Sequence, residues 1–182
     1  MRVISGTARG RKLETPKNMD TRPTSDMVKE AIFNIIQVKL PEARVLDLFS
    51  GTGQLGIEAL SRGAELCVFV DQSREMLGLT ARNINHTGLE AQSKTVCSGA
   101  IEYLERAEKF DIIILDPPYD TDLIDKALAK IIEFDILREH GIIICESRAE
   151  HKMPELTAPY GKSREYRYGQ KKITLYKKER NA

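Results

Sequence analysis

The sequence predicts an α/β protein with a doubly wound, mostly parallel sheet, and three observations support this fold class. Short apolar runs alternate with helical patterns along most of the 182 residues, as they do where crossover helices join parallel strands. A glycine turn at Ser50-Gly51-Thr52-Gly53 separates the first apolar run from a helical pattern. Near the end of the chain, polar and apolar residues alternate on both sides of Gly169-Gln170, which indicates an antiparallel hairpin instead of another crossover.

The first predicted helix lies before the glycine turn. Apolar residues between 28 and 36 recur at the spacing of an amphipathic helix, Ser25 is its candidate N-cap, and Pro41 ends it. The apolar run 45–49 then suits a strand that is buried on both faces. The helix that follows the glycine turn is expected to stop at Gly63.

The later elements continue the alternation of strands and helices. A helix capped by Ser73 and closed by Gly88 is expected after the second strand. The other predicted helices are a short one through Tyr103 and Leu104 and a longer one over 123–132. Further strands are expected at 66–70, 93–97, 110–115 and 141–146, followed by the two halves of the hairpin at 163–169 and 172–176.

Length and composition predict one monomeric domain with a small appendage. We expect residues 1–22 to form a basic arm, in which 3–6 pairs with 12–15 as a β-hairpin, and residues 23–182 to form the main domain. The basic N-terminus and the lack of a long apolar run predict a cytoplasmic protein without a membrane span. No metal-ligand spacing is present, and the three cysteines are expected to be buried and reduced: Cys67, Cys97 and Cys145.

Charge is distributed unevenly, although the net charge is only +1. Residues 1–29 carry a net charge of +4 and residues 162–182 a net charge of +6, whereas residues 30–161 carry −9. Solvated tails would account for this pattern without any function. A polyanion-binding surface where the two basic ends meet is the interpretation that we favour.

The glycine turn and the end of the next strand form a candidate ligand site. Gly51-x-Gly53-x-x-Gly56 alone is weak evidence, because dinucleotide-binding proteins share its spacing. Asp71 ends an apolar run about twenty residues after Gly51, where a ribose-binding acid belongs. Asp47 either lies close to the ligand or accepts a backbone N–H that orders the turn.

The tetrapeptide Asp116-Pro117-Pro118-Tyr119 carries the most specific chemistry. Consecutive prolines stiffen the loop after a third apolar run. The Asp116 carboxylate and the Pro117 carbonyl can therefore accept both N–H bonds of one exocyclic amino group, which aims the nitrogen lone pair at an electrophilic methyl group. Tyr119 can stack on a base that is unpaired or flipped out. A dinucleotide dehydrogenase has no need of this sequence, and a simple strand-capping turn is the structural alternative.

Several segments together resemble the RsmD family, bacterial methyltransferases that modify the N2 amino group of one guanine in 16S rRNA. The glycine and Asp-Pro-Pro-Tyr motifs occur in many amino-methyltransferases, and the N-terminal segments narrow the choice. The likeness covers nearly the whole chain and includes the segments 2–13, 21–26, 30–34, 46–53, 56–63 and 116–119.

The resemblance implies a class I S-adenosylmethionine-dependent methyltransferase, with a Rossmann-like sheet of seven strands of which the last is antiparallel. On matching positions, Asp47, Gly51 and Gly53 would surround the methionine part of the donor. Asp71 would contact its ribose. The target base would lie against Asp116, Pro117 and Tyr119. The chain departs from the wider pattern at Gly99, where many relatives carry Asp or Asn against the adenine amino group. A backbone group near Gly99 and Ala100 would have to serve instead.

The implied function is methylation of the N2 amino group of a specific guanine in 16S rRNA during assembly of the small subunit. The predicted RNA contacts are the basic residues of the arm, Arg9, Arg11, Lys12 and Arg22. A DNA adenine-N6 or cytosine-N4 methyltransferase is one alternative, although the chain lacks an obvious sequence-reading domain. A non-catalytic RNA-binding assembly factor is another, against which the intact Asp116, Gly51 and Gly53 argue.

Overall fold

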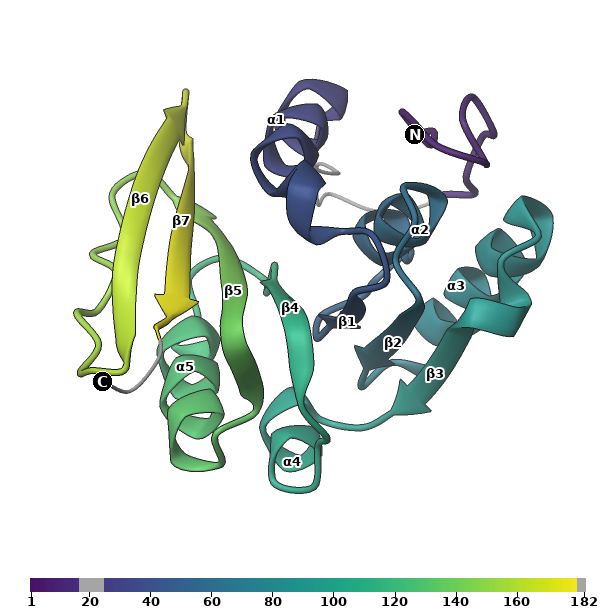
Figure 1. Cartoon of the computed structure of the whole chain (residues 1–182). Helices are drawn as coiled ribbons and strands as arrows, with labels where there is room; N and C mark the ends of the chain where they lie inside the picture. Colours follow the sequence, from purple (N-terminus) through teal and green to yellow (C-terminus); the bar gives the residue numbers. More distant parts are fainter. Residues whose placement is uncertain (17–24, 180–182) are drawn as a thin grey trace.

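A seven-stranded sheet in the order β3-β2-β1-β4-β5-β7-β6 forms the centre of the protein (Figure 1). The computed structural model describes residues 1–16 and 25–179. Neighbouring strands from β3 to β5 are parallel, whereas β7 runs antiparallel to both of its neighbours, β5 and β6. The strands are β1 (Arg44–Asp47), β2 (Leu66–Asp71), β3 (Ser93–Cys97), β4 (Phe110–Leu115), β5 (Leu137–Arg148), β6 (Tyr160–Tyr168) and β7 (Lys171–Lys178). The predicted fold class is confirmed.

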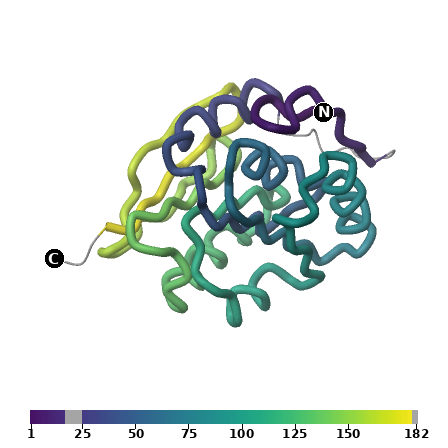
Figure 2. The backbone as a smooth tube through the Cα atoms, turned by 45° about the vertical axis from the view of Figure 1, so that its right-hand side comes forward, coloured from purple at the N-terminus to yellow at the C-terminus, as the bar shows by residue number. Residues whose placement is uncertain are grey.

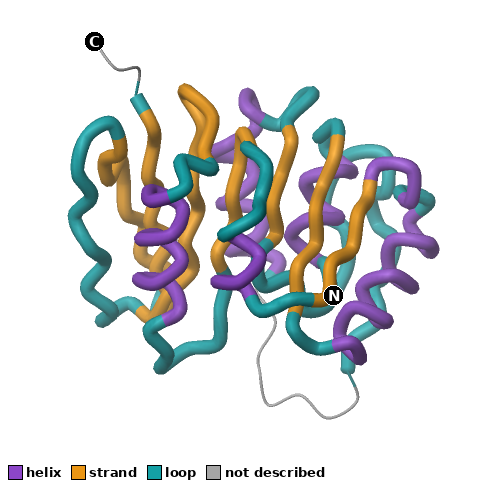
Figure 3. Tube along the Cα trace, turned by 90° about the horizontal axis from the view of Figure 1, so that it is seen from below, coloured by secondary structure: helices purple, strands orange, loops and turns teal. Residues whose placement is uncertain are grey.

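Helices cover both faces of the sheet (Figures 1 and 3). The helices are α1 (Asp26–Ile36), α2 (Gln54–Ser61), α3 (Arg74–Thr87), α4 (Ala100–Leu104) and α5 (Leu123–Glu133). Successive strand residues point to opposite faces. Ile112 and Ile114 therefore pack in the core under α1, α2 and α3, while Ile113 and Leu115 pack in the core under α4 and α5. Burial on both faces explains why the central strands are almost continuously apolar.

The helix termini follow the capping chemistry that the sequence predicts. The Ser25 Oγ accepts a hydrogen bond from the Val28 N–H at 3.3 Å, and the Ser73 Oγ accepts one from the Met76 N–H at 3.2 Å. Gly88 ends α3 in the left-handed conformation, with φ of 71°. Each cap satisfies a backbone group that a helix end would otherwise leave unpaired.

The C-terminal hairpin is confirmed, but its second strand does not lie at the edge of the sheet. The turn contains Gly169, with φ of 60°, and β7 returns between β5 and β6. The central residues of β7, from Ile173 to Tyr176, are all buried, whereas most of β6 is at least partly exposed. The interior position of β7 accounts for this difference, because an interior strand is covered along both of its edges.

The described part of the N-terminal arm, residues 1–16, packs against α2 and α3. Its ends pair through an isolated Arg2–Lys12 bridge, so the predicted pairing of 3–6 with 12–15 is shifted toward the N-terminus. This shift places three small or apolar side chains in the core: Val3, Ala8 and Leu13.

A buried carboxylate fixes the arm to α2. Glu58 is fully buried and accepts the Ile4 N–H at 2.8 Å and the Ser5 N–H at 3.0 Å. Its charge is balanced by the Arg62 Nε at 2.8 Å and by the buried Lys29 Nζ at 3.9 Å. The backbone of the arm at Gly6 also packs directly against the backbone of α2 at Ser61. A side chain at position 6 would collide with the Ser61 carbonyl, so this contact requires glycine.

The two basic ends of the chain flank α1 (Figure 2). The arm lies on one side of this helix and the β6–β7 hairpin lies on the other.

The three cysteines differ in their burial. Cys67 and Cys145 are buried, but Cys97 is exposed, because it ends β3 at the edge of the sheet; the expectation that all three thiols are buried was wrong. Among residues 1–16 and 25–179, no helix is long and apolar enough to cross a membrane. The same residues contain no cluster of three or more His, Cys, Asp or Glu side chains with the arrangement of a metal site.

Candidate active site

A cavity of about 1390 Å³, here called the main cavity, opens at the carboxyl ends of the central strands. It lies where β1 pairs with both β2 and β4, and this reversal of strand order is where α/β sheets bind ligands. Four acids from neighbouring strand ends line its wall: Asp47 of β1, Asp71 of β2, Asp116 after β4 and Glu146 of β5. The main cavity therefore favours a ligand that carries positive charge.

The glycine turn forms one side of the main cavity. Gly51 and Gly53 have φ of 52° and 78°, in the left-handed region that favours glycine. Gly51 lines the cavity, but Gly53 does not: a Cβ there would stand 2.8 Å from the Thr80 Cγ2. Gly53 thus allows the turn to pack against α3, while Gly51 and Thr52 line the cavity.

Asp47 is almost fully buried at the base of this turn. Its Oδ2 accepts the Gly56 N–H of the first turn of α2 at 2.9 Å. Burial raises the pKa of Asp47 to about 7; the Gly56 hydrogen bond opposes this shift and the nearby Asp71 carboxylate adds to it. Because a carboxylate already occupies the helix start, this position is a poor site for a phosphate and a good one for a cationic group.

Asp71 connects the glycine turn to α3. Its Oδ2 accepts the Gly51 N–H at 3.0 Å, and its Oδ1 accepts the Ser73 N–H at 2.8 Å. Each carboxylate oxygen can accept more than one hydrogen bond, and Asp71 lines the main cavity. The carboxylate can therefore hold the turn and still accept hydrogen bonds from a diol.

The next wall of the main cavity is formed by Ser98 and Ala100 but not by Gly99. Gly99 is the N-cap of α4, with φ of −61°, and a Cβ there would meet only the Glu102 Oε2, at 4.0 Å. Neither backbone conformation nor space requires a glycine at this position.

The Asp116–Tyr119 loop forms the opposite wall, and Tyr119 is held from several sides. Its hydroxyl donates to the Glu146 Oε1 at 2.9 Å, and the Lys171 Nζ donates to the same oxygen. The Arg148 guanidinium lies 5.2 Å from the Tyr119 ring centroid, and the Lys171 Nζ lies 5.8 Å from it. Burial and the Glu146 carboxylate raise the pKa of Tyr119, so the phenol keeps its proton.

The structure adds residues that the sequence analysis did not identify. Ser50 and Gln54 line the main cavity, and their side-chain oxygens Ser50 Oγ and Gln54 Oε1 are buried beneath its surface without a hydrogen-bond partner within the described ranges. Glu146 and Lys171 also line it. Glu146 follows the apolar residues of a central strand, as Asp47 does, and this shared pattern is a signal that could have identified it.

Of the predicted RNA-binding residues of the arm, Arg9, Arg11 and Lys12 do not line the main cavity. The Arg11 Nη1 donates to the His86 carbonyl at 2.6 Å near the end of α3, whereas Arg9 and Lys12 are exposed. Arg22 lies outside the described residues. The rim of the cavity is reached instead by the end of the arm and the start of α1, through Thr15, Pro16, Ser25, Met27 and Val28.

Fold and cavity together define a class I methyltransferase of the Rossmann-like type. The chain belongs to the family described as "Conserved hypothetical protein 95", whose pattern matches residues 1–177, and the resemblance to the RsmD family is thereby confirmed.

Similar proteins agree with this membership over their whole length. The "Putative rRNA methyltransferase YlbH" of Bacillus subtilis is 40% identical, over 98% of this chain and 99% of that protein. The "Ribosomal RNA small subunit methyltransferase D" of Escherichia coli K12 is 32% identical, over 98% of this chain and 90% of that protein. The solved structure of the "Putative methyltransferase yhhF" from Escherichia coli superimposes with a TM-score of 0.89 at 32% identity, covering 98% of each chain.

Proposed function

We propose that this protein transfers a methyl group from S-adenosylmethionine to the N2 amino group of a guanine in 16S rRNA. The observation that carries the proposal is that Asp47, Asp71 and the Asp116–Tyr119 loop line one cavity at the carboxyl ends of the strands. The printed names of the Bacillus subtilis and Escherichia coli relatives support ribosomal RNA as the substrate.

The residues of the main cavity fit S-adenosylmethionine. This donor, when bound, supplies an electrophilic methyl group on a positively charged sulfur, and it carries an ammonium group as well. Asp47 and the other acids of the wall complement these charges, while Asp71 accepts hydrogen bonds from the ribose hydroxyls. Ser50 Oγ and Gln54 Oε1 are buried and unpaired among the described residues, so a change of side-chain rotamer would let them bond to the polar groups of the methionine part. Ser98 and Ala100 line the cavity, so the backbone there can meet the adenine.

The Asp116–Tyr119 loop positions the acceptor amine. Pro117 is buried and Asp116 is half-buried on the cavity wall. The Asp116 carboxylate and the Pro117 carbonyl each accept one N–H of the amino group, which points the nitrogen lone pair into the main cavity. Formation of the N–C bond would break the methyl–sulfur bond of the donor, so that the positive charge passes from the sulfur to the nitrogen, and Asp116 is then placed to accept the proton that the nitrogen releases. Such positioning supplies up to roughly 7–11 kcal/mol in ideal cases.

Guanine fits the acceptor side of the cavity better than adenine does. Guanine presents N–H donors at N1 and N2, whereas adenine presents an acceptor at N1 beside its amino group. The Asp116 carboxylate and the Pro117 carbonyl are the acceptors that the loop offers on this wall. Donors along the whole guanine edge are therefore complementary to the wall, and the adenine N1 is not.

Methyl transfer to 30S particles and to free 16S rRNA from cells that lack the protein tests the proposal directly. Labelled donor followed by nucleoside mass spectrometry should yield N2-methylguanosine. Asp116→Asn should reduce the rate at least 100-fold and leave donor affinity within a few-fold, whereas Asp122→Asn, an exposed acid in the same segment, should act as wild type. Methylated adenosine or cytidine would contradict the choice of base, and absence of transfer would contradict the proposal as a whole.

The arm is proposed to contact RNA phosphates through Arg9, Arg11 and Lys12, together with Arg22. Neutralising the first three together should weaken RNA binding and flatten its salt dependence, by about 0.7–0.9 in the logarithmic slope for each lost phosphate contact. Donor affinity should not change, because none of the three lines the main cavity. Melting temperatures must be compared, since Arg11 also bonds to the His86 carbonyl.

A matched control for this variant neutralises exposed or half-exposed lysines on and near α5, on the other face of the sheet: Lys109, Lys126 and Lys130. Its salt slope should equal that of the wild type. If the arm variant and this control variant show the same dependence of RNA affinity on salt concentration, the arm has no phosphate-binding role.

A further inference from the structure

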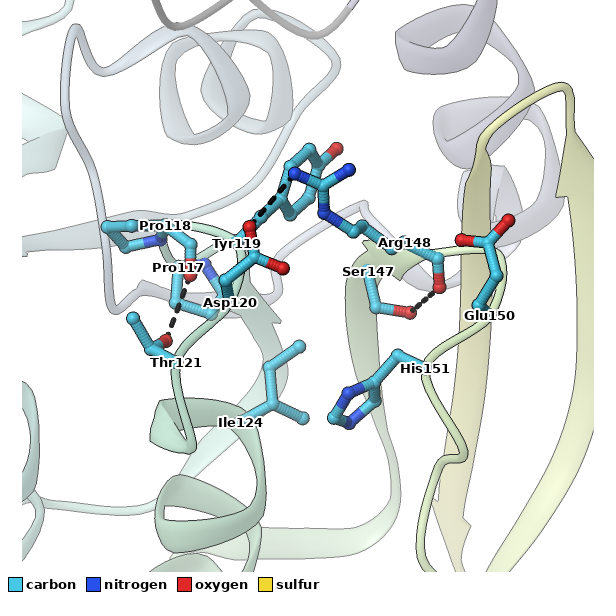
Figure 4. Close-up of a pocket in the computed structure, with 10 residues that line it drawn as sticks. All are labelled: Pro117, Pro118, Tyr119, Asp120, Thr121, Ile124, Ser147, Arg148, Glu150 and His151. Carbon is cyan, nitrogen blue, oxygen red and sulfur yellow. Dashed lines mark hydrogen bonds and ion pairs between the residues drawn. The ribbon is translucent and has the colours of Figure 1, made fainter.

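A second cavity of about 260 Å³, here called the side cavity, lies beyond the Asp116–Tyr119 loop (Figure 4). Its walls come from the end of that loop, from the first turn of α5 and from the segment after β5. The lining residues are Pro117, Pro118, Tyr119, Asp120, Thr121, Ile124, Ser147, Arg148, Glu150 and His151. No part of the proposed methyl transfer uses this space.

The side cavity meets the main cavity at a shared wall. Pro117, Pro118, Tyr119 and Arg148 line both cavities. The Arg148 guanidinium lies 5.2 Å from the Tyr119 ring centroid and donates to the Asp120 Oδ2 at 2.9 Å (Figure 4). An aromatic ring and a guanidinium therefore stand between the two spaces.

The lining of the side cavity suits a flat, partly apolar ligand that carries hydrogen-bond donors. Pro117, Pro118 and Ile124 provide apolar surface, and the planar Arg148 guanidinium, which lies over the Tyr119 ring, provides the kind of face on which unpaired bases stack. The carboxylates of Asp120 and Glu150 line the cavity and disfavour a phosphate.

One lining group has an unused hydrogen-bonding atom. The His151 Nε2 is buried and forms no hydrogen bond within the described ranges; the Asp125 Oδ1, at 3.6 Å, is the acid that faces it. The His151 side chain as a whole is 29% exposed and lines the cavity, so a bound base would contact its imidazole ring.

We propose that the side cavity binds the base of the nucleotide next to the methylated one, and this inference depends on the proposed function. A target base in the main cavity and its neighbour in the chain are joined by one phosphodiester link. The neighbour must therefore lie within reach of the Tyr119–Arg148 wall. Stacking there sets the register of the RNA strand, so that one particular nucleotide presents its amino group to Asp116.

Filling the side cavity tests the proposal. Ile124→Phe adds bulk inside it, while Ile132→Phe adds the same bulk on the same helix without lining either cavity. With 30S particles as substrate, Ile124→Phe should raise KM about tenfold and leave kcat, donor affinity and melting temperature close to wild type. Ile132→Phe should leave KM unchanged. Equal KM values for both variants and the wild type would overturn the proposal.

A binding measurement keeps the proposal testable without turnover. Imidazole proton signals of His151, assigned by their loss in His151→Asn, should shift when GMP or AMP is added to the protein saturated with S-adenosylhomocysteine. Ribose 5-phosphate should not shift them. The same shifts with ribose 5-phosphate, or none with either nucleotide, would overturn the proposal. Failure of the wild-type protein to methylate RNA would instead overturn the proposed function, so the two failures are distinguishable.

Discussion

Replacing Asp47 by Asn should stabilise the protein at alkaline pH, because it removes a buried charge and keeps an acceptor for the Gly56 N–H. The pKa of Asp47 is raised to about 7, against about 3.9 for an unfolded aspartate. The contribution of this group to stability is therefore fully present below about pH 4 and is lost as pH rises through 7. A shift of about three units at about 1.4 kcal/mol each gives a loss of up to about 4 kcal/mol.

Melting and denaturant unfolding at pH 4.5 and pH 8 measure the difference. Asp47→Asn should be close to wild type at pH 4.5 and more stable at pH 8, by up to about 8–16 °C in Tm for a chain of this size. Asp111→Asn is a matched control at the opposite end of the sheet, where the aspartate accepts the Arg44 N–H and pairs with Arg138; it should gain nothing at pH 8.

The same substitution should weaken donor binding. A cationic donor favours ionised Asp47, so wild-type affinity should rise as pH increases through about 7, and binding near pH 6.5 should release a proton. Calorimetry in buffers of different ionisation enthalpy detects that proton, and Asp47→Asn should abolish its release. The reasoning is refuted if Asp47→Asn is less stable than wild type at pH 8, or if the stability difference is the same at both pH values.

Two further predictions concern stability. Lys171→Met leaves the buried Glu146 without its ammonium partner and should lower the unfolding free energy by about 3–5 kcal/mol. The double variant that also carries Glu146→Gln should recover part of that loss. Strictly additive effects of the two substitutions in denaturant titrations would contradict the pairing. Gly6→Ala should cost several kcal/mol more than Gly10→Ala, for which about 1–2 kcal/mol is expected from positive φ alone. The reason is that a Cβ at Gly6 would stand 1.7 Å from the Ser61 carbonyl oxygen, whereas one at Gly10 meets nothing within 4 Å. Equal losses of unfolding free energy for the two variants, measured by chemical denaturation, would exclude the tight contact.

Local patterns were sufficient to predict most of the sheet and the helices. Each central strand is buried on both faces and reads as an apolar run, and each of the helices α1 and α3 starts at a serine that accepts a backbone N–H. The position of β7 could not be predicted in this way, because both strands of the hairpin carry strand-like patterns. Only pairing with β5, a contact distant in sequence, decides which of the two strands is interior.

The site residues could be predicted from the sequence where an acidic residue stands at the end of an apolar strand. Asp47, Asp71 and Asp116 each end or follow a buried strand, and parallel strands bring those ends to one edge of the sheet. The surroundings of Tyr119 were not predictable, since Glu146 and Lys171 come from distant strands. The attachment of the arm also depends on tertiary contacts, above all on Glu58, which a helix pattern presents as an ordinary surface acid.

The interior position of β7 has a consequence for synthesis of the protein. Strand β6 is made before β7, yet among the described strands it pairs with β7 alone and has no other partner in the sheet until β7 arrives. A nascent chain that has reached β6 therefore exposes an unpaired edge of β5, and the loop after β4 lacks Lys171. Completion of the sheet and of the surroundings of Tyr119 must wait until the last strand leaves the ribosome. A truncation before β7 should accordingly aggregate during synthesis instead of folding with reduced activity.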